Sequence, residues 1–148
     1  MRMKSLFFFL VLSLFITSCA SLRNSTPVLY QEFSQYEISA NENNIIELAG
    51  NFFSSSLLGN NYQDNPDAVS QLLFKNYMLN TDGHFEKINK KEGCLTINGY
   101  DEENSPLIFS LKYISNNNQW LIDEIHVVFV ENKSDFSSSA KCPSDYAN

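Results

Sequence analysis

Residues 107–129, LIFSLKYISNNNQWLIDEIHVVF, decide the fold of this chain. Apolar and polar residues alternate on both sides of the asparagine run 116–118, and this period of two is typical of β-strands with one buried face. The asparagines predict the turn of a hairpin. The alternation shifts phase at Asp123 and Glu124, which indicates a β-bulge in the second strand.

Two further strands are expected upstream of this hairpin. Residues 84–88 and 94–100 carry the strand pattern, and the turn 89–93 lies between them. The loop 101–105 then leads to Pro106, which is tolerated at the first position of a strand. The second half of the chain therefore predicts a run of antiparallel strands.

The region before the strands has helical spacing. Ser39-Ala40-Asn41-Glu42 has the form of a capping box and predicts the start of a helix, which Gly59 ends. The apolar face of this helix comprises Ile45, Leu48, Ala49, Phe52 and Phe53. A second helix is expected to begin at Asn65 and Pro66. Its core-facing residues are Val69, Leu72, Leu73, Tyr77 and Met78.

Helices followed by antiparallel strands predict an α+β fold, with N-terminal helices packed on a curved sheet in a single domain. We place this domain at residues 39–132, followed by a C-terminal tail at 133–148; residues 28–38 fit a short helix or an extended segment. A net charge of −7 argues against nucleic-acid binding and against a polybasic membrane-surface protein. An aromatic content of 14% argues against disorder.

The first eighteen residues have the pattern of a secretory signal peptide. Arg2 and Lys4 precede an apolar run from Leu6 to Ile16. This run is too short for a membrane-spanning helix, which needs about 20 residues, but it has the length of a signal-peptide core. We therefore exclude residues 1–18 from the fold.

Ile16-Thr17-Ser18-Cys19 resembles the lipobox of bacterial lipoproteins. The resemblance implies cleavage before Cys19, a diacylglycerol thioether on its sulfur and acylation of the freed amine. Residues 19–38 would then be the lipidated cysteine and a spacer. Because Ala20 and Ser21 follow the cysteine, the family's sorting rule implies the periplasmic face of the outer membrane, with the inner membrane as the alternative. Ordinary signal cleavage that leaves Cys19 free is a second alternative.

Cys94 and Cys142 are left as a pair once Cys19 is used as the tether. In an oxidising compartment such a pair tends to form a disulfide, which would pin the C-terminal tail to the domain. Two free thiols, or a zinc site completed by His84 or His126, are the alternatives.

The order of elements and the stretch Trp120-Leu121-Ile122-Asp123-Glu124-Ile125 resemble the cone-shaped fold of nuclear transport factor two and ketosteroid isomerase. The resemblance implies a curved sheet that wraps a helix. The candidate ligand-lining residues of such a cone are Phe52, Phe53, Tyr113 and Trp120, together with Leu111 and Ile122. A filled core, and a cystatin-like or other helix-on-sheet arrangement, are the alternatives.

The sequence contains no catalytic constellation, and we predict no enzyme activity, cofactor or metal. The residues weighed for proton transfer are His84, His126, Asp101, Asp123 and Glu124. His84 follows a turn glycine and has no acidic partner nearby in sequence except Glu86, and the other four are expected to lie on the surface or in a loop. We expect a non-catalytic interaction or accessory module of the cell envelope, with an envelope protein as partner; an immunity-type protein is one form of this. The alternative is a small-molecule or lipid-binding cone with weak proton-transfer activity.

The lipobox generates a direct prediction. Cys19→Ala removes the sulfur that would carry the diacylglycerol, so the variant should leave the membrane fraction. Two or more acyl chains anchor a protein firmly, whereas none leaves only weak surface contacts. Fractionation of cells followed by immunoblotting checks this, and variant protein that stays with the membranes would contradict the lipoprotein interpretation.

Overall fold

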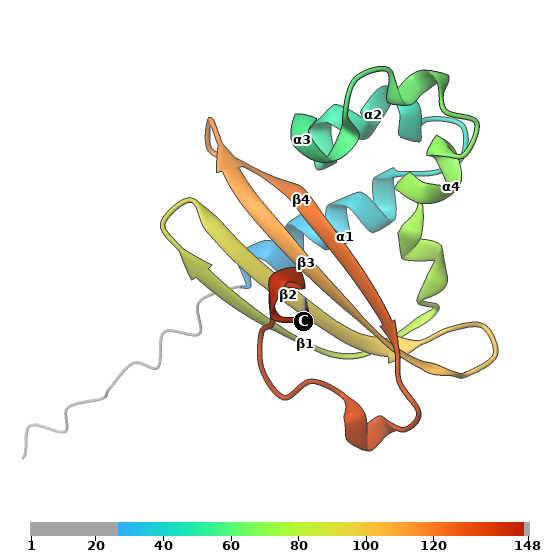
Figure 1. The fold of residues 1–148 in the computed structure, drawn as a ribbon, viewed down its shortest axis with the longest axis vertical. Coiled ribbons are helices and arrows are strands. Elements are labelled where there is room, and N and C mark those ends of the chain that lie inside the picture. Colours follow the sequence, from blue (N-terminus) through green and yellow to red (C-terminus); the bar gives the residue numbers. More distant parts are fainter. Residues whose placement is uncertain (1–26, 147–148) are drawn as a thin grey trace, which may run out of the picture.

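The computed structural model describes residues 27–146, which form a single α+β domain (Figure 1). Its helices are α1 (Val28–Ser39), α2 (Ile45–Phe52), α3 (Ser55–Leu58) and α4 (Ala68–Leu72). Its strands are β1 (Asn80–Asn89), β2 (Glu92–Tyr100), β3 (Pro106–Asn116) and β4 (Gln119–Phe129). Short 3-10 turns are η1 (Tyr62–Asp64), η2 (Phe74–Tyr77), η3 (Lys133–Asp135) and η4 (Pro143–Tyr146).

The four strands form an open antiparallel sheet in the order β1-β2-β3-β4. The bulge that the sequence predicts is present: Lys112 faces Glu124, the next residue Tyr113 faces Ile122, and Asp123 is left without a partner in β3. A second irregularity at Asp82 interrupts the pairing of β1 with β2. The two edge strands, β1 and β4, are thus each bent once.

The core lies between the sheet and the helices, with α1 crossing one face of the sheet (Figure 1). It is rich in aromatic rings. Phe74 lies 5.4 Å from Tyr36 and 5.3 Å from Phe109 between ring centroids. Tyr36 also meets Phe53 edge-on at 5.4 Å. These are favourable aromatic geometries, so the interior is packed by interlocking rings.

Helix α1 belongs to the domain, and the expected domain boundary at residue 39 is wrong. Leu29, Phe33 and Tyr36 are almost completely buried at spacings of four and three residues, which place them on one helix face. The spacer inferred for residues 19–38 therefore extends no further than Pro27. The segment is hard to recognise from sequence because its apolar face contains few residues and no N-cap side chain precedes it.

The two ends of α1 are capped by side chains from distant parts of the chain. The carboxylate of Glu86, on β1, accepts hydrogen bonds from the backbone N–H groups of Val28, Leu29 and Tyr30 at 2.9, 2.9 and 3.2 Å. At the other end the ammonium group of Lys75 donates to the carbonyl oxygen of Glu37. Both charges complement the helix dipole and satisfy groups that the helix leaves unpaired.

The first predicted helix begins later than expected, and near its end it is broken into two shorter helices. Ser39 ends α1, and α2 begins only at Ile45, after a turn in which Asn44 Oδ1 accepts the N–H of Asn41. At Phe53 and Ser54 the backbone pairs with β4 instead of continuing the helix: the Ser54 N–H donates to the Ile122 carbonyl at 2.9 Å. Ser54 then caps the short α3. Pairing with the sheet edge is the physical reason for the break.

The second predicted helix is shorter than expected. After Leu72 the chain tightens into the 3-10 turn η2, which shifts the phase of the apolar residues. As a result Phe74 is buried, whereas Tyr77, expected to face the core, is exposed.

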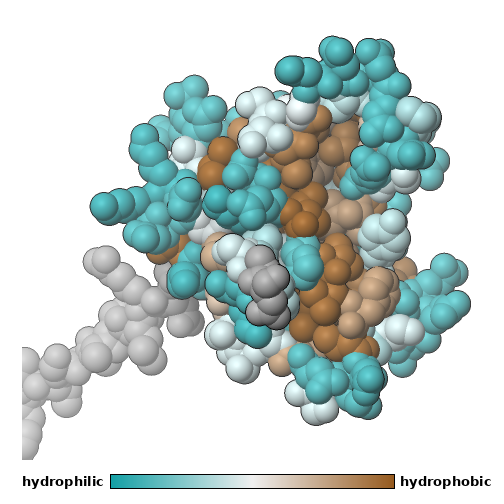
Figure 2. All heavy atoms as spheres, in the orientation of Figure 1, coloured by the Kyte–Doolittle hydropathy of each residue, from teal (hydrophilic) through white to brown (hydrophobic). Residues whose placement is uncertain are grey.

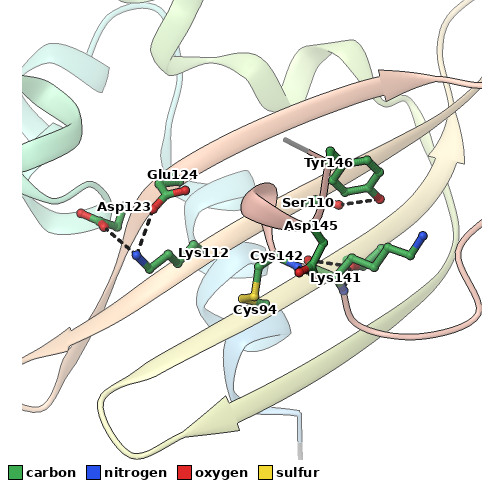
Figure 3. Close-up of a disulfide and its surroundings, with 10 residues drawn as sticks. Cys94, Ser110, Lys112, Asp123, Glu124, Lys141, Cys142, Asp145 and Tyr146 are labelled. Atoms are coloured by element: carbon green, nitrogen blue, oxygen red, sulfur yellow. Dashed lines mark hydrogen bonds and ion pairs between the residues drawn. A yellow bond between two sulfur atoms is a disulfide. The ribbon is translucent and has the colours of Figure 1, made fainter. Parts of the chain in front are cut away.

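The C-terminal tail covers the other face of the sheet. Cys94 and Cys142 form the predicted disulfide, which leaves neither thiol free for zinc (Figure 3). Closing a loop of 48 positions stabilises a domain by about 4 kcal/mol in the chain-entropy description. Asn98 exchanges two hydrogen bonds with the backbone of Ser137, and Thr96 does so with Lys141. These contacts bury polar side chains on the outer face without leaving them unpaired.

The cap on α1 generates the second prediction. Glu86→Ala leaves three backbone N–H groups of α1 without their acceptor, so it should lower the free energy of unfolding by about 1–2 kcal/mol. Urea denaturation followed by circular dichroism measures this. Glu103→Ala, in the exposed loop between β2 and β3, is the matched control and should change stability by less than about 0.5 kcal/mol. Equal effects of the two substitutions would contradict the capping role.

Candidate functional site

The second half of β4, residues 124–129, is the candidate site because it is a mainly apolar strand whose outer edge pairs with no other strand among residues 27–146. Phe129 is 58% exposed, and Ile125, Val127 and Val128 are each partly exposed. Within the described part of the chain, β3 is the only strand that pairs with these residues. Figure 2 shows a stripe of apolar side chains that follows β4 toward its C-terminal end. We call residues 124–129 the β4 edge.

The backbone pairing between the helical layer and β4 falls on the first half of the strand. Phe53 bridges Ile122, and α3 begins directly after Ser54. Beyond the bulge, Ile125, Val127 and Phe129 face the same side of the sheet as their partners Leu111, Phe109 and Leu107. Ile125 and Val127 pack against the core, and Phe129 ends the row as an exposed side chain.

The bulge before the β4 edge holds a group of charges, drawn in Figure 3. Ser54 Oγ donates to Asp123 Oδ1 at 2.7 Å. Lys112 Nζ lies 2.9 Å from Glu124 Oε1 and 3.7 Å from Asp123 Oδ2. The hydrogen bond to Glu124 raises the pKa of Lys112. These side chains are partly exposed to solvent, which screens the ion pairs, so the pairs orient the bulge more than they stabilise it.

A hollow of about 300 Å³ lies beside the disulfide on the outer face. Its lining contains two carboxylates, Glu92 and Glu124, and two ammonium groups, Lys87 and Lys112. The two negative and two positive groups balance, and Lys112 is already paired with Glu124, so the lining offers no net charge that would attract a ligand of one sign. We do not assign it a ligand.

The residues weighed for proton transfer do not form one site. The His84 ring stacks on Tyr30 at 3.7 Å, on the helix side of the sheet. His126 lies on the opposite face, 4.7 Å from Tyr146 of the tail. Asp101 accepts the N–H groups of Glu103 and Ser105 and so shapes the β2–β3 loop. Only Asp123 and Glu124, which are neighbours in sequence, lie together.

The four candidate ligand-lining residues are placed in and around the packed core. Phe53 and Tyr113 are each 1% exposed, and Phe52 and Trp120 pack against them from the margin. The Tyr36 ring lies 5.5 Å from Phe52 and 5.4 Å from Phe53. Aromatic rings thus occupy the space that a cone ligand would need around these two phenylalanines.

The hydroxyl group of Tyr113 is an exception within this core. It is buried and has no hydrogen-bond partner among the described residues. Burial raises the pKa of this hydroxyl well above its ordinary value. An unpaired buried hydroxyl is unfavourable by about 1–3 kcal/mol, so this atom is the one polar feature of the interior that packing does not explain.

The sequence predicts a strand at residues 125–129, but its alternation does not show that this strand lies at the edge of the sheet. The signal was the run Val127-Val128-Phe129-Val130, in which alternation gives way to consecutive apolar residues. Such a run indicates a strand that is apolar on both faces. Which face remains exposed depends on where the helices and the tail end.

Comparisons with protein families, with curated proteins and with solved structures found no match to this chain. Cys19 lies outside the described residues. Between Pro27 and Tyr146, no helix has the length and apolar character needed to cross a membrane. The same stretch holds no group of three His, Cys, Asp or Glu side chains arranged to bind a metal ion.

The Tyr113 hydroxyl generates the third prediction. Tyr113→Phe removes an unpaired buried hydroxyl and should raise the free energy of unfolding by about 1 kcal/mol. Tyr36→Phe is the matched control: the Tyr36 hydroxyl donates to the Leu72 carbonyl at 2.6 Å, so its loss should lower stability by about 1 kcal/mol. Denaturant titration compares the two. A loss of stability in Tyr113→Phe would contradict the unpaired state of this hydroxyl.

Proposed function

We propose that this protein is a non-catalytic interaction module of the cell envelope, anchored through Cys19 at the periplasmic face of the outer membrane. The observation that carries the interaction role is the uncovered β4 edge. An extended segment of an envelope protein would add beside β4 as a fifth strand, with main-chain hydrogen bonds for affinity and apolar contacts for specificity.

The contrast between the two sheet edges supports this role. Natural proteins protect free edges with bulges and charged residues, because an unprotected edge pairs with other chains. Edge strand β1 is protected by the irregularity at Asp82 and by charged residues along its length, among them Glu86 and Lys87. The bulge of β4 protects only its first half, and beyond Glu124 the strand carries no charged residue. An edge left in this state fits a partner strand.

The position of the β4 edge also suits a tethered module. Val28 lies beside the end of the sheet that carries the β1–β2 turn, since its N–H binds Glu86. Glu86 lies in one row of the sheet with Leu95, Leu111 and Ile125, and Phe129 lies four residues beyond Ile125 along β4. Four residues of strand span about 13 Å. The Phe129 end of the β4 edge would therefore lie away from a membrane that holds the N-terminal end.

The fourth prediction tests the partner and the edge together. Tagged protein solubilised in mild detergent from its own membranes should retain one stoichiometric envelope protein, identified by mass spectrometry. Phe129→Lys places a charge on the β4 edge and should reduce the recovered partner at least tenfold, because charged residues block strand addition.

Ile38→Lys is the matched control for this experiment. Ile38 is the most exposed of the large apolar residues of the domain at 80%, and it lies at the end of α1, outside the β4 edge. The control should retain the partner. Equal loss in both variants would show that the edge is not the binding surface, and protein that is recovered alone would count against the interaction role.

The second candidate function is a small-molecule-binding cone related to nuclear transport factor two. Two features fit a relationship to the nuclear transport factor two fold: the helices precede an antiparallel sheet, and α1 packs across one face of that sheet. The buried Tyr113 hydroxyl favours a ligand. The packed rings around Phe53 and the four-stranded order of the sheet make this the weaker candidate.

A further inference from the structure

Three lysines of the β1–β2 hairpin carry positive charge that the domain does not neutralise. Lys87, Lys90 and Lys91 are exposed, and no carboxylate within residues 27–146 forms an ion pair with them. Glu92 is the remaining charged residue of the turn. We call Lys87, Lys90 and Lys91 the hairpin lysines.

Every other lysine of the described residues is engaged within the domain. Lys75 donates to the Glu37 carbonyl and Lys112 pairs with Glu124. Lys133 pairs with Asp82 at 2.6 Å, and the Lys141 ammonium lies 5.4 Å from the centre of the Tyr146 ring. The net charge of −7 argues against a protein that is basic as a whole, but among residues 27–146 the lysines without a partner in the domain are gathered at one hairpin.

The hairpin lysines lie where the chain enters the domain. Glu86 holds the first N–H groups of α1 and directly precedes Lys87. The side chains of Leu29 and Ile88 both lie beside Gly93, on the other strand of the hairpin. Figure 1 shows the start of α1 beside the end of β1. Val28 and Ile88 are also exposed apolar residues, 39% and 41% accessible.

The chain between Cys19 and Val28 limits how far this end can move from a lipid anchor. Nine residues span at most about 30 Å when fully extended. A domain of this size has a radius of gyration of about 13–14 Å, hence a diameter of about 35 Å. An anchor at Cys19 would thus keep the hairpin end within about 30 Å of the bilayer, which is less than the width of the domain.

We propose that the hairpin lysines bind the headgroups of anionic phospholipids and dock this end of the domain on the membrane, with Val28 and Ile88 in contact with the interface. The lipid anchor of the proposed function brings the surface into reach; the contact itself is independent of the β4 edge. Near an anionic surface each lysine strengthens binding about fivefold, and high salt screens this attraction.

The test uses the chain purified from its own membranes and reconstituted into vesicles. Hydrogen exchange of residues 87–93 is compared between vesicles of phosphatidylcholine alone and vesicles with 30% phosphatidylglycerol. Exchange should slow at least fivefold in the anionic vesicles at low salt and return to the phosphatidylcholine rate in 0.5 M NaCl. The mass of the N-terminal peptide reports separately whether Cys19 is acylated, so a missing anchor and a failed headgroup contact give different results.

Two double variants of equal charge test whether the hairpin lysines cause the slower exchange in anionic vesicles. Lys90→Gln/Lys91→Gln should abolish the lipid-dependent protection, whereas Lys133→Gln/Lys141→Gln, which removes the same charge elsewhere, should retain it. Equal exchange in both kinds of vesicle, protection outside the hairpin only, or loss in both double variants would overturn the proposal. Circular dichroism of each variant confirms that the domain is folded.

Discussion

Helix α1 is held at both ends by charged side chains from other parts of the chain, and the core is built on it. The Glu86 carboxylate accepts three N–H groups at its start, and Lys75 donates near its end. Fixed in this way, the helix places Phe33 and Tyr36 among the rings of Phe53, Phe74 and Phe109. A short helix without caps of its own would be marginal in isolation, so its stability comes from these tertiary contacts.

The C-terminal tail gives the sheet a second cover that is made mainly of polar contacts. Thr96, Asn98 and Ser110 are buried on the outer face and bond to the tail through its backbone or through Tyr146. The disulfide keeps the tail in place at Cys94. The helices cover one face and the tail covers much of the other, so in the second half of β4 the large apolar side chain that stays exposed is Phe129.

The two ends of the domain differ in the residues that they expose. One end carries the start of α1 and the hairpin lysines, and the other carries Phe129 and the end of β4. Under the proposed function, such an arrangement would separate the end that faces the membrane from the end that binds the partner. The separation results from the antiparallel order of the strands, which puts the β1–β2 turn and the end of β4 at opposite ends of the sheet.

The α+β class, the strands, the bulge at Asp123 and the Cys94–Cys142 pair can be predicted from the sequence, because they depend on local periodicity and on the number of cysteines. Three features required the folded domain: residues 28–39 form a core helix, the predicted helix breaks at Phe53, and the outer edge of β4 beyond the bulge has no strand partner among the described residues. Each of these depends on a partner distant in sequence: Glu86 for α1, Ile122 for Phe53, and the ends of the helical layer for β4. Local patterns carry no information about such partners.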